Sequence, residues 1–182
     1  TDDLIDVYKN SKKLMPLVHL PVQSGSDKIL NLMNRKHSVK SYLEIFYRLK
    51  KINPNIEFSS DFIIAYPGEE KSDFQETINL IDEIKFINSY SFIFSPRPGT
   101  VAADLKLIDK KKSMERLEII QQKLFDNQRA MNKKLENTII NVLVENRTDD
   151  KSKLFARSEY MTSVLFSGSD NLIGKIVKIK IK

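Results

Sequence analysis

The chain has 182 residues, of which 41% are hydrophobic and 30% charged, with a formal net charge of +6 and no cysteine. These values are typical of a globular protein of one mid-sized domain or slightly more, and no apolar run approaches the roughly 18 residues of a membrane span. The lack of cysteine excludes disulfides and any thiolate metal site built from this chain alone. The basic balance permits nucleic-acid binding without requiring it.

Both ends of the sequence suggest that it is a fragment of a longer protein. It opens at Thr1 rather than Met, and it closes on "IGKIVKIKIK", an alternating strand pattern with no turn after it. A strand that stops at a terminus lacks a partner. The polar, amphipathic N-terminal segment does not have the pattern of a signal peptide, so we expect cytoplasmic localisation.

Helix and strand patterns alternate through the first half of the chain. In order they are a helix over 3–13, a strand over 16–22, helices over 26–36 and 38–52, a strand over 56–66, a helix over 72–84 and a strand over 89–95. Ser24 or Ser26 is expected to cap the second helix, and Ser72 with Gln75 to form a capping box. Such alternation predicts an α/β fold with parallel strands, either a barrel or an open sheet.

The pattern changes in the second half of the chain. A long helix is predicted over about 113–135, and four short strands of period two follow it. Four strands after a long helix indicate a separate small antiparallel β-barrel. We therefore expect two domains, residues 1–136 and residues 137–182.

Polar and turn-forming residues stand at the end of each predicted strand of the first half. The first strand leads to Gln23 and Ser24, the second carries Asp61 and ends at Tyr66, and Arg97 follows the third. Ligands of α/β proteins bind at the carboxyl ends of the strands. Amides and hydroxyls suit a ribose, and arginine suits a carboxylate or phosphate. We expect these side chains to face one pocket, although each taken singly also fits an ordinary cap or turn.

The sequence also contains two histidines and an aspartate in strand or loop positions that could be structural or functional. His19 lies in an apolar strand and is expected to be a hydrogen-bonded core residue, whereas His37 is expected at the surface or at a cap. Asp61 needs a partner because an unpaired carboxylate in an apolar strand is unfavourable. It either pairs with Arg97 or binds a ligand hydroxyl. No nucleophile–base pair, Walker loop or GxGxxG motif is present.

The combination of "HLPVQSGSD", "IIAYPGEE" and "YSFIFSPRPGT" resembles the methylthiotransferase branch of the radical S-adenosylmethionine (SAM) enzymes. The tail "LFARSEYMTSVLFSGSDNLIGKIVKIKIK" resembles the TRAM domain of that family, a small OB-like, RNA-binding β-barrel. The resemblance implies a transferase that adds a 2-methylthio group to isopentenyladenosine beside the anticodon of tRNA. It also implies two [4Fe–4S] clusters, whose cysteine ligands are absent from this chain, so that the fragment alone is expected to be inactive.

The resemblance implies roles for the strand-end residues. In this family the ends of these strands, here the C-terminal part of a partial (βα) barrel, line the SAM pocket. Gln23 and Ser24 would lie near the ribose or methionine moiety, Asp61 and Tyr66 along the cofactor, and Arg97 beside the cofactor or the substrate. The family usually has Gly-Phe where this chain has Ala65 and Tyr66.

The resemblance implies that the tail contacts the anticodon stem-loop of tRNA. Eight basic and five acidic residues follow position 137, and phosphates attract such an excess. Arg157, Lys175, Lys178 and Lys180 are the expected RNA contacts, and the rings of Tyr160 and Phe166 are available for stacking. The alternative is that the lysines do not bind RNA and only keep an edge strand solvated. We expect a monomer without membrane contact.

Two other functions stay open at this point. One is a sister methylthiotransferase that acts on a ribosomal-protein aspartate or on threonylcarbamoyl-adenosine. The arginine of "SPRPGT" favours the isopentenyladenosine enzyme over these sisters. The other is a non-catalytic RNA-binding protein that keeps the scaffold.

Overall fold

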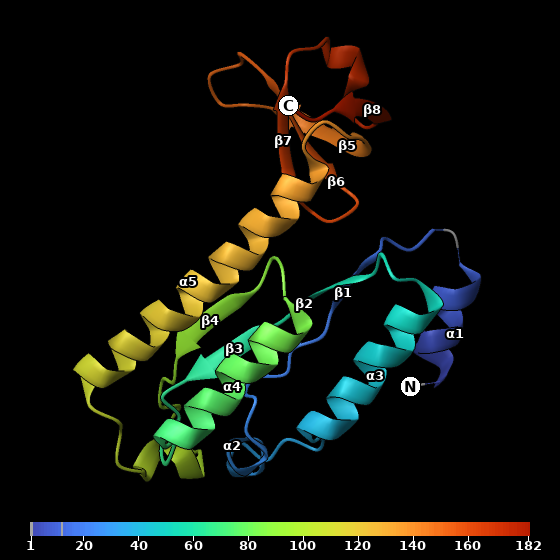
Figure 1. Cartoon of the computed structure of the whole chain (residues 1–182). Coiled ribbons are helices and arrows are strands. Elements are labelled where there is room, and N and C mark those ends of the chain that lie inside the picture. The colour runs from blue at the N-terminus through green and yellow to red at the C-terminus, as the bar shows by residue number, and fades with distance from the viewer. Residues whose placement is uncertain (1, 12) are drawn as a thin grey trace.

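Figure 1 shows the computed structural model of the chain, which describes residues 2–11 and 13–182. An α/β region comes first, followed by a long connecting helix and a C-terminal region of antiparallel strands. The α/β region contains α1 (Asp2–Asn10), β1 (Leu17–His19), α2 (Asp27–Leu32), α3 (Val39–Ile52), β2 (Glu57–Ser59), β3 (Asp61–Ile64), α4 (Lys71–Ile84), β4 (Tyr90–Ile93) and η1 (Val101–Asp104). The rest contains α5 (Lys110–Leu135), β5 (Ile139–Arg147), β6 (Leu154–Ser158), β7 (Ser163–Phe166), η2 (Asp170–Leu172) and β8 (Ile176–Lys180).

The strands of the α/β region are parallel, as the alternating pattern predicted. β1 pairs with β2 and β3 pairs with β4, and a parallel bridge between Gln23 and Phe62 joins the two pairs. The strand predicted over 56–66 is interrupted at Ser60. There the Ser60 hydroxyl accepts the Val22 N–H at 2.9 Å, and the Ser60 N–H donates to the Ser89 hydroxyl at 2.8 Å. Side chains thus replace part of the backbone ladder.

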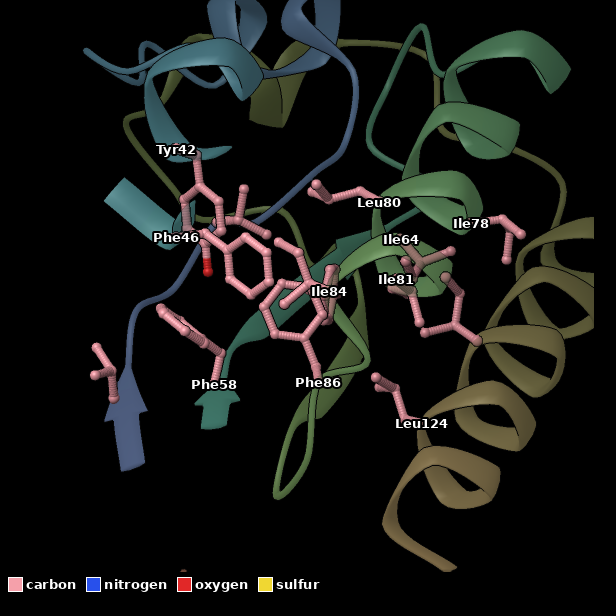
Figure 2. Packing of buried hydrophobic residues seen from close by; sticks show 14 of the residues in the cluster. Tyr42, Phe46, Phe58, Ile64, Ile78, Leu80, Ile81, Ile84, Phe86 and Leu124 are labelled. Atoms are coloured by element: carbon pink, nitrogen blue, oxygen red, sulfur yellow. The ribbon is translucent and has the colours of Figure 1, made fainter. Parts of the chain in front are cut away.

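Helices cover one face of this sheet. Phe58, Phe62 and Ile64 point into the core and are at most 1% exposed. Figure 2 shows Phe58 and Ile64 among side chains of α3, α4 and α5. On the other face Tyr90 is 64% and Phe92 is 54% exposed. The sheet therefore has one packed face and one open face.

Most predicted helices are present, with differences at their ends. α3 begins after Ser38, whose hydroxyl accepts the Ser41 N–H at 3.1 Å. The capping box predicted at Ser72 is wrong. The N-cap of α4 is Glu70, two residues before Ser72, and the carboxylate of Asp73 accepts the Glu70 N–H at 2.8 Å. α1 ends at Asn10, before the end of the predicted helix 3–13, in which residue 12 lies outside the described residues.

The C-terminal region forms one antiparallel sheet in the order β7-β6-β5-β8, which confirms the four predicted strands. Its small core contains Val142, Val144, Leu154 and Ala156, each at most 1% exposed. α5 ends at Leu135 and β5 begins at Ile139. The predicted domain boundary at residue 137 falls between these two elements and stays a prediction.

Tyr160 joins the C-terminal region to the α/β region. Its hydroxyl donates to the Asn55 carbonyl at 3.1 Å, and its own carbonyl accepts from the Asn88 side chain at 2.6 Å. The ring expected to stack on RNA is therefore engaged between the two regions, and Phe166 packs against the C-terminal core. Asn55 and Asn88 precede β2 and β4, so this contact lies at the amino ends of the strands.

Candidate cofactor and nucleic-acid sites

The strand predicted over 16–22 is shorter, since β1 ends at His19, and Gln23 lies four residues further on in a left-handed backbone conformation with φ 74°. Its N–H donates to the Asp61 carbonyl at 3.0 Å, and its carbonyl accepts the Ile63 N–H at 2.9 Å. The residue is 9% exposed, and no hydrogen bond of its side chain is recorded among the described residues. The Gln23 amide therefore keeps its full capacity to bind a ligand.

The small residues after Gln23 pack against α4. The Ser24 hydroxyl is buried, lies 3.4 Å from the Thr77 hydroxyl and accepts the Ser26 N–H at 3.1 Å. A Cβ on Gly25 would lie 2.5 Å from the Thr77 Cα. The Ser26 hydroxyl donates to the Asp73 carboxylate at 2.8 Å. Residues 24–26 are small and polar because they fit against the backbone of α4. From the sequence, the structural role expected for these residues was only that of an ordinary helix cap.

Asp61 pairs with His19 rather than with Arg97. The His19 Nε2 lies 3.6 Å from the Asp61 carboxylate, and its Nδ1 lies 2.9 Å from the Ser59 hydroxyl. The side chain of His19 is 52% exposed, so the prediction of a core histidine is wrong. Its neighbours explain this, since Val18 takes the inward position and the alternation of a strand sends His19 to the open face.

Tyr66 lies in the turn that ends β3. It is 7% exposed, its hydroxyl donates to the Leu32 carbonyl at 3.0 Å, and its ring packs edge-on against Phe94 at 4.8 Å between centroids. Tyr66 thus holds the turn to α2 and to the chain after β4. Ala65 before it has φ 58°, a conformation that favours the glycine usual at this position.

Arg97 lies beyond the end of β4, in an exposed loop. Its carbonyl accepts from the Thr100 hydroxyl at 2.8 Å, which closes the turn while the guanidinium faces solvent. The ends of β3 and β4 lie side by side, because the Phe94 N–H donates to the Ile64 carbonyl at 2.8 Å. Two surface hollows of about 620 Å³ and about 550 Å³ are lined by other residues. A cavity shared by Gln23, Asp61 and Arg97 stays a prediction.

A buried ion pair that sequence reasoning missed joins the turn after β3 to α5. The Glu69 carboxylate accepts from the Arg116 guanidinium, and their side chains are 2% and 5% exposed. Burial raises the pKa of the Glu69 carboxyl above its ordinary value, although Arg116 opposes this. Arg116 lies on the same helical stripe as the buried Ile120 and Leu124. A charged residue on an apolar stripe indicates a buried partner, and this pattern could have predicted the ion pair from the sequence.

The outer face of the C-terminal sheet combines cations with exposed apolar side chains. Ile139 is 67% and Ile176 is 72% exposed, and Lys178 and Lys180 lie beside them on β8. Arg157 stacks over the Phe155 ring at 5.3 Å and pairs with Glu145 at 3.2 Å. The sheet register places Arg157 between β5 and β7, and Lys175 precedes β8.

The residues of this chain do not fit an iron–sulfur cluster. The sequence has no cysteine, and the described residues contain no group of three histidine, aspartate or glutamate side chains that could hold a metal ion. The Gln23 amide and the exposed Arg97 guanidinium are separated by β3, and both have the chemistry to bind the hydroxyl and carboxylate groups of a ligand such as SAM. In the part of the chain that the structure describes, no helix has the length and apolar character needed to cross a membrane.

Known proteins match both regions. Residues 1–81 match the Radical SAM superfamily and residues 133–182 match the TRAM domain. We refer to residues 1–81 as the radical SAM segment and to residues 133–182 as the TRAM domain. The radical SAM segment contains β1, β2 and β3 with the helices α1, α2, α3 and most of α4, and the TRAM domain contains the antiparallel sheet.

Curated relatives match the radical SAM segment, the connecting helix and the TRAM domain together. A protein of Pelagibacter ubique (strain HTCC1062) named tRNA-2-methylthio-N(6)-dimethylallyladenosine synthase is 68% identical over 181 residues. Proteins of the same name from Histophilus somni (strain 129Pt) and Yersinia pestis are 45% and 43% identical over 183 residues. Each match covers 100% of this chain but only 41% or 39% of the relative. The chain thus spans about two fifths of their length.

Proposed function

We propose that the chain is the C-terminal part of an enzyme that adds a 2-methylthio group to dimethylallyladenosine in tRNA, beside the anticodon. The observation that carries this proposal is the 68% identity over the whole chain to a protein of that name. The order of a radical SAM segment and a TRAM domain supports it. The whole enzyme is proposed to hold two [4Fe–4S] clusters on cysteines outside this chain.

The open face of the parallel sheet is proposed to be the inner face of a partial barrel. The helices α3, α4 and α5 pack against the opposite face, and the open face exposes Tyr90 and Phe92 together with the His19–Asp61 pair. A sheet that closes into a barrel places such a face inside. The antiparallel sheet of the TRAM domain is likewise proposed to curl into a small barrel.

The strand-end residues are proposed to bind SAM. Gln23 is oriented by its two backbone hydrogen bonds to the neighbouring strand, and its amide can donate to and accept from a ribose or a carboxylate. Arg97 supplies a cation for a carboxylate or phosphate. When bound, SAM supplies the radical chemistry of the proposed reaction. Ser24 and Tyr66 support this site indirectly, since their hydroxyls contact protein groups.

The outer face of the TRAM domain is proposed to bind the anticodon stem-loop. Lys178, Lys180 and Lys175 attract phosphates, and the Arg157–Phe155 stack offers a flat surface for a base. This face and the strand-end turns lie at opposite ends of α5, whose 26 residues span about 39 Å. A tRNA that reaches both must extend along this helix. We propose a cytoplasmic monomer.

The test uses the full-length protein with its clusters and a tRNA that carries dimethylallyladenosine. We expect mass spectrometry of the digested tRNA to show a 2-methylthio product. In Arg97→Ala we expect about tenfold weaker SAM binding or lost product, because a charge-assisted contact is removed. Lys106→Ala, an exposed cation after the same loop, serves as the matched control and should leave both unchanged.

The outcomes separate the proposed function from its alternatives. No methylthiolated tRNA from the full-length, cluster-loaded protein would overturn the proposal. Product on a ribosomal-protein aspartate or on threonylcarbamoyl-adenosine would identify a sister enzyme. RNA binding without SAM binding would identify the non-catalytic protein.

A further inference from the structure

The turn that ends β3, residues 65–69, is held by the buried pair of Glu69 and Arg116, which are 47 residues apart in the sequence. We propose that this pair is a positioning element that fixes the turn for the bound cofactor. The inference rests on the proposed function, because it assigns the pair a part in SAM binding. It concerns residues that touch the turn and not the cofactor itself.

Both oxygens of the Glu69 carboxylate are used inside the protein. Oε2 accepts the Ala65 N–H at 3.1 Å, and Oε1 accepts from Nη1 of Arg116. The same Nη1 donates to the Glu69 carbonyl at 3.1 Å. The Glu69 N–H in turn donates to the Tyr66 carbonyl at 2.9 Å. One side chain therefore fixes both ends of a five-residue turn.

The turn needs such support because its backbone is unfavourable for these residues. Ala65 has φ 58°, a left-handed conformation in which a Cβ crowds the backbone. Gly68 has φ 86°, which glycine adopts readily. A left-handed alanine persists only where its surroundings determine it, and the Glu69 contact to its N–H does this.

Arg116 comes from α5 and locks this turn to the outer layer of helices. Its guanidinium lies over the Phe74 ring of α4 at 5.2 Å, so the planar group is held on two sides. Nη2 is buried and has no acceptor among the described residues. A lysine has no planar fork and could not make the same set of contacts.

The position of the turn connects it to the candidate cofactor site. Directly before it, the Ile63 N–H donates to the Gln23 carbonyl at 2.9 Å, and the Ile64 carbonyl accepts from Phe94 at 2.8 Å. The ends of three strands thus share hydrogen bonds next to this turn. A shift of the turn would move Gln23 and the chain that leads to Arg97.

A purely structural role is the alternative. Buried ion pairs often add little net stability, while removal of one partner leaves an uncompensated charge and destabilises the fold. Loss of stability alone therefore does not distinguish the two roles. The distinguishing quantities are the local exchange of the turn amides and the affinity for SAM in variants that remain folded.

The experiment compares Arg116→Lys, Arg116→Met and Glu69→Gln in the full-length, cluster-loaded protein. Ile120→Val, one helical turn further along the same buried stripe of α5, is the matched control. Hydrogen–deuterium exchange of a peptide over residues 63–70 reports on the turn. Calorimetry with SAM gives the dissociation constant, and the thermal midpoint gives stability.

We expect faster exchange over residues 63–70 and about tenfold to a hundredfold weaker SAM binding in Arg116→Met and Glu69→Gln, because small misplacements of binding groups have large effects. Arg116→Lys should recover part of the affinity. Ile120→Val should lower only the thermal midpoint. If Arg116→Met does not fold, Arg116→Lys and Glu69→Gln decide the question.

Unchanged exchange and unchanged SAM affinity in folded variants, with a lowered midpoint, would overturn the positioning role and leave a structural pair. Failure of the wild-type protein to bind SAM would instead contradict the proposed function. The two failures are therefore distinguishable, and the exchange measurement tests the turn in either case.

Discussion

The α/β region and the TRAM domain differ in the polar side chains that they bury. Together with α5, the α/β region buries a set of polar side chains, namely Gln23, Ser24, Ser26, Ser59, Ser60, Glu69, Asp73, Thr77, Ser113 and Arg116, whereas the buried polar residue of the TRAM domain is Ser158. Both regions expose large apolar side chains, for example Tyr90 and Phe92 on β4 and Ile139 and Ile176 on β5 and β8. The buried polar groups hold tight turns within the chain, and the exposed apolar groups fit a surface that meets a partner.

Because of this difference, we expect substitutions in the α/β region to change stability and substitutions on the outer face of the TRAM domain to change binding. In the α/β region hydroxyls replace backbone partners at Ser60 and Thr77, so a small steric change propagates into a helix or strand. On the outer TRAM face most side chains contact solvent, so a change there leaves the fold intact. Substitutions should therefore separate stability in one region from binding in the other.

The largest expected effect is that of Gly25→Ala. The new Cβ would lie 2.5 Å from the Thr77 Cα and 2.6 Å from the Glu76 carbonyl oxygen, so α4 must move away from the segment that precedes α2. We expect a loss of about 3 kcal/mol in the free energy of unfolding, measured by urea denaturation. Gly99→Ala is the control, because it meets nothing within 4 Å and should lose only about 1 kcal/mol through its φ of 81°. Equal losses of unfolding free energy in the two variants would show that α4 can move without a large cost.

A smaller effect is expected at the contact between the two regions. Tyr160→Phe removes the hydrogen bond to the Asn55 carbonyl and leaves the ring in place. We expect a loss of about 1 kcal/mol, the usual net value of one hydrogen bond. Asn88→Ala removes the neighbouring contact to the Tyr160 carbonyl, and a double-mutant cycle should show coupling between the two changes. Strict additivity would mean that the two contacts act independently.

The smallest effect on stability is expected on the outer face of the TRAM domain. Lys178→Ala should leave the urea midpoint unchanged, because the side chain is exposed. If it contacts a phosphate, the slope of log binding constant against log salt for the tRNA should fall by about 1. Lys151→Ala, an exposed cation in the turn between β5 and β6, is the control and should not change the slope. The same slope for wild type and Lys178→Ala would remove this residue from the interface.

The helices and strands can be predicted from local patterns of the sequence, but the contacts of several site residues cannot. The stripes at three and four spacing located α3, α4 and α5, and period two located the four TRAM strands. The prediction for Gln23 keeps its support, because its side chain has no recorded partner among the described residues. Of the two alternatives for Asp61, the pair with Arg97 is wrong, because His19 lies 3.6 Å from the carboxylate, whereas binding of a ligand hydroxyl stays a prediction. Nothing in the local pattern sets that distance.

The sequence by itself determined the alternation of strands and helices, the change to antiparallel strands and the resemblance to a family. These properties depend on the spacing of side chains along one segment, which a linear pattern records. Only the tertiary structure decided that Arg116 meets Glu69, that Gly25 lies against Thr77 and that Tyr160 joins two regions. Such contacts bridge 47, 52 and 105 residues and depend on strand register and helix rotation, which packing of the whole chain sets.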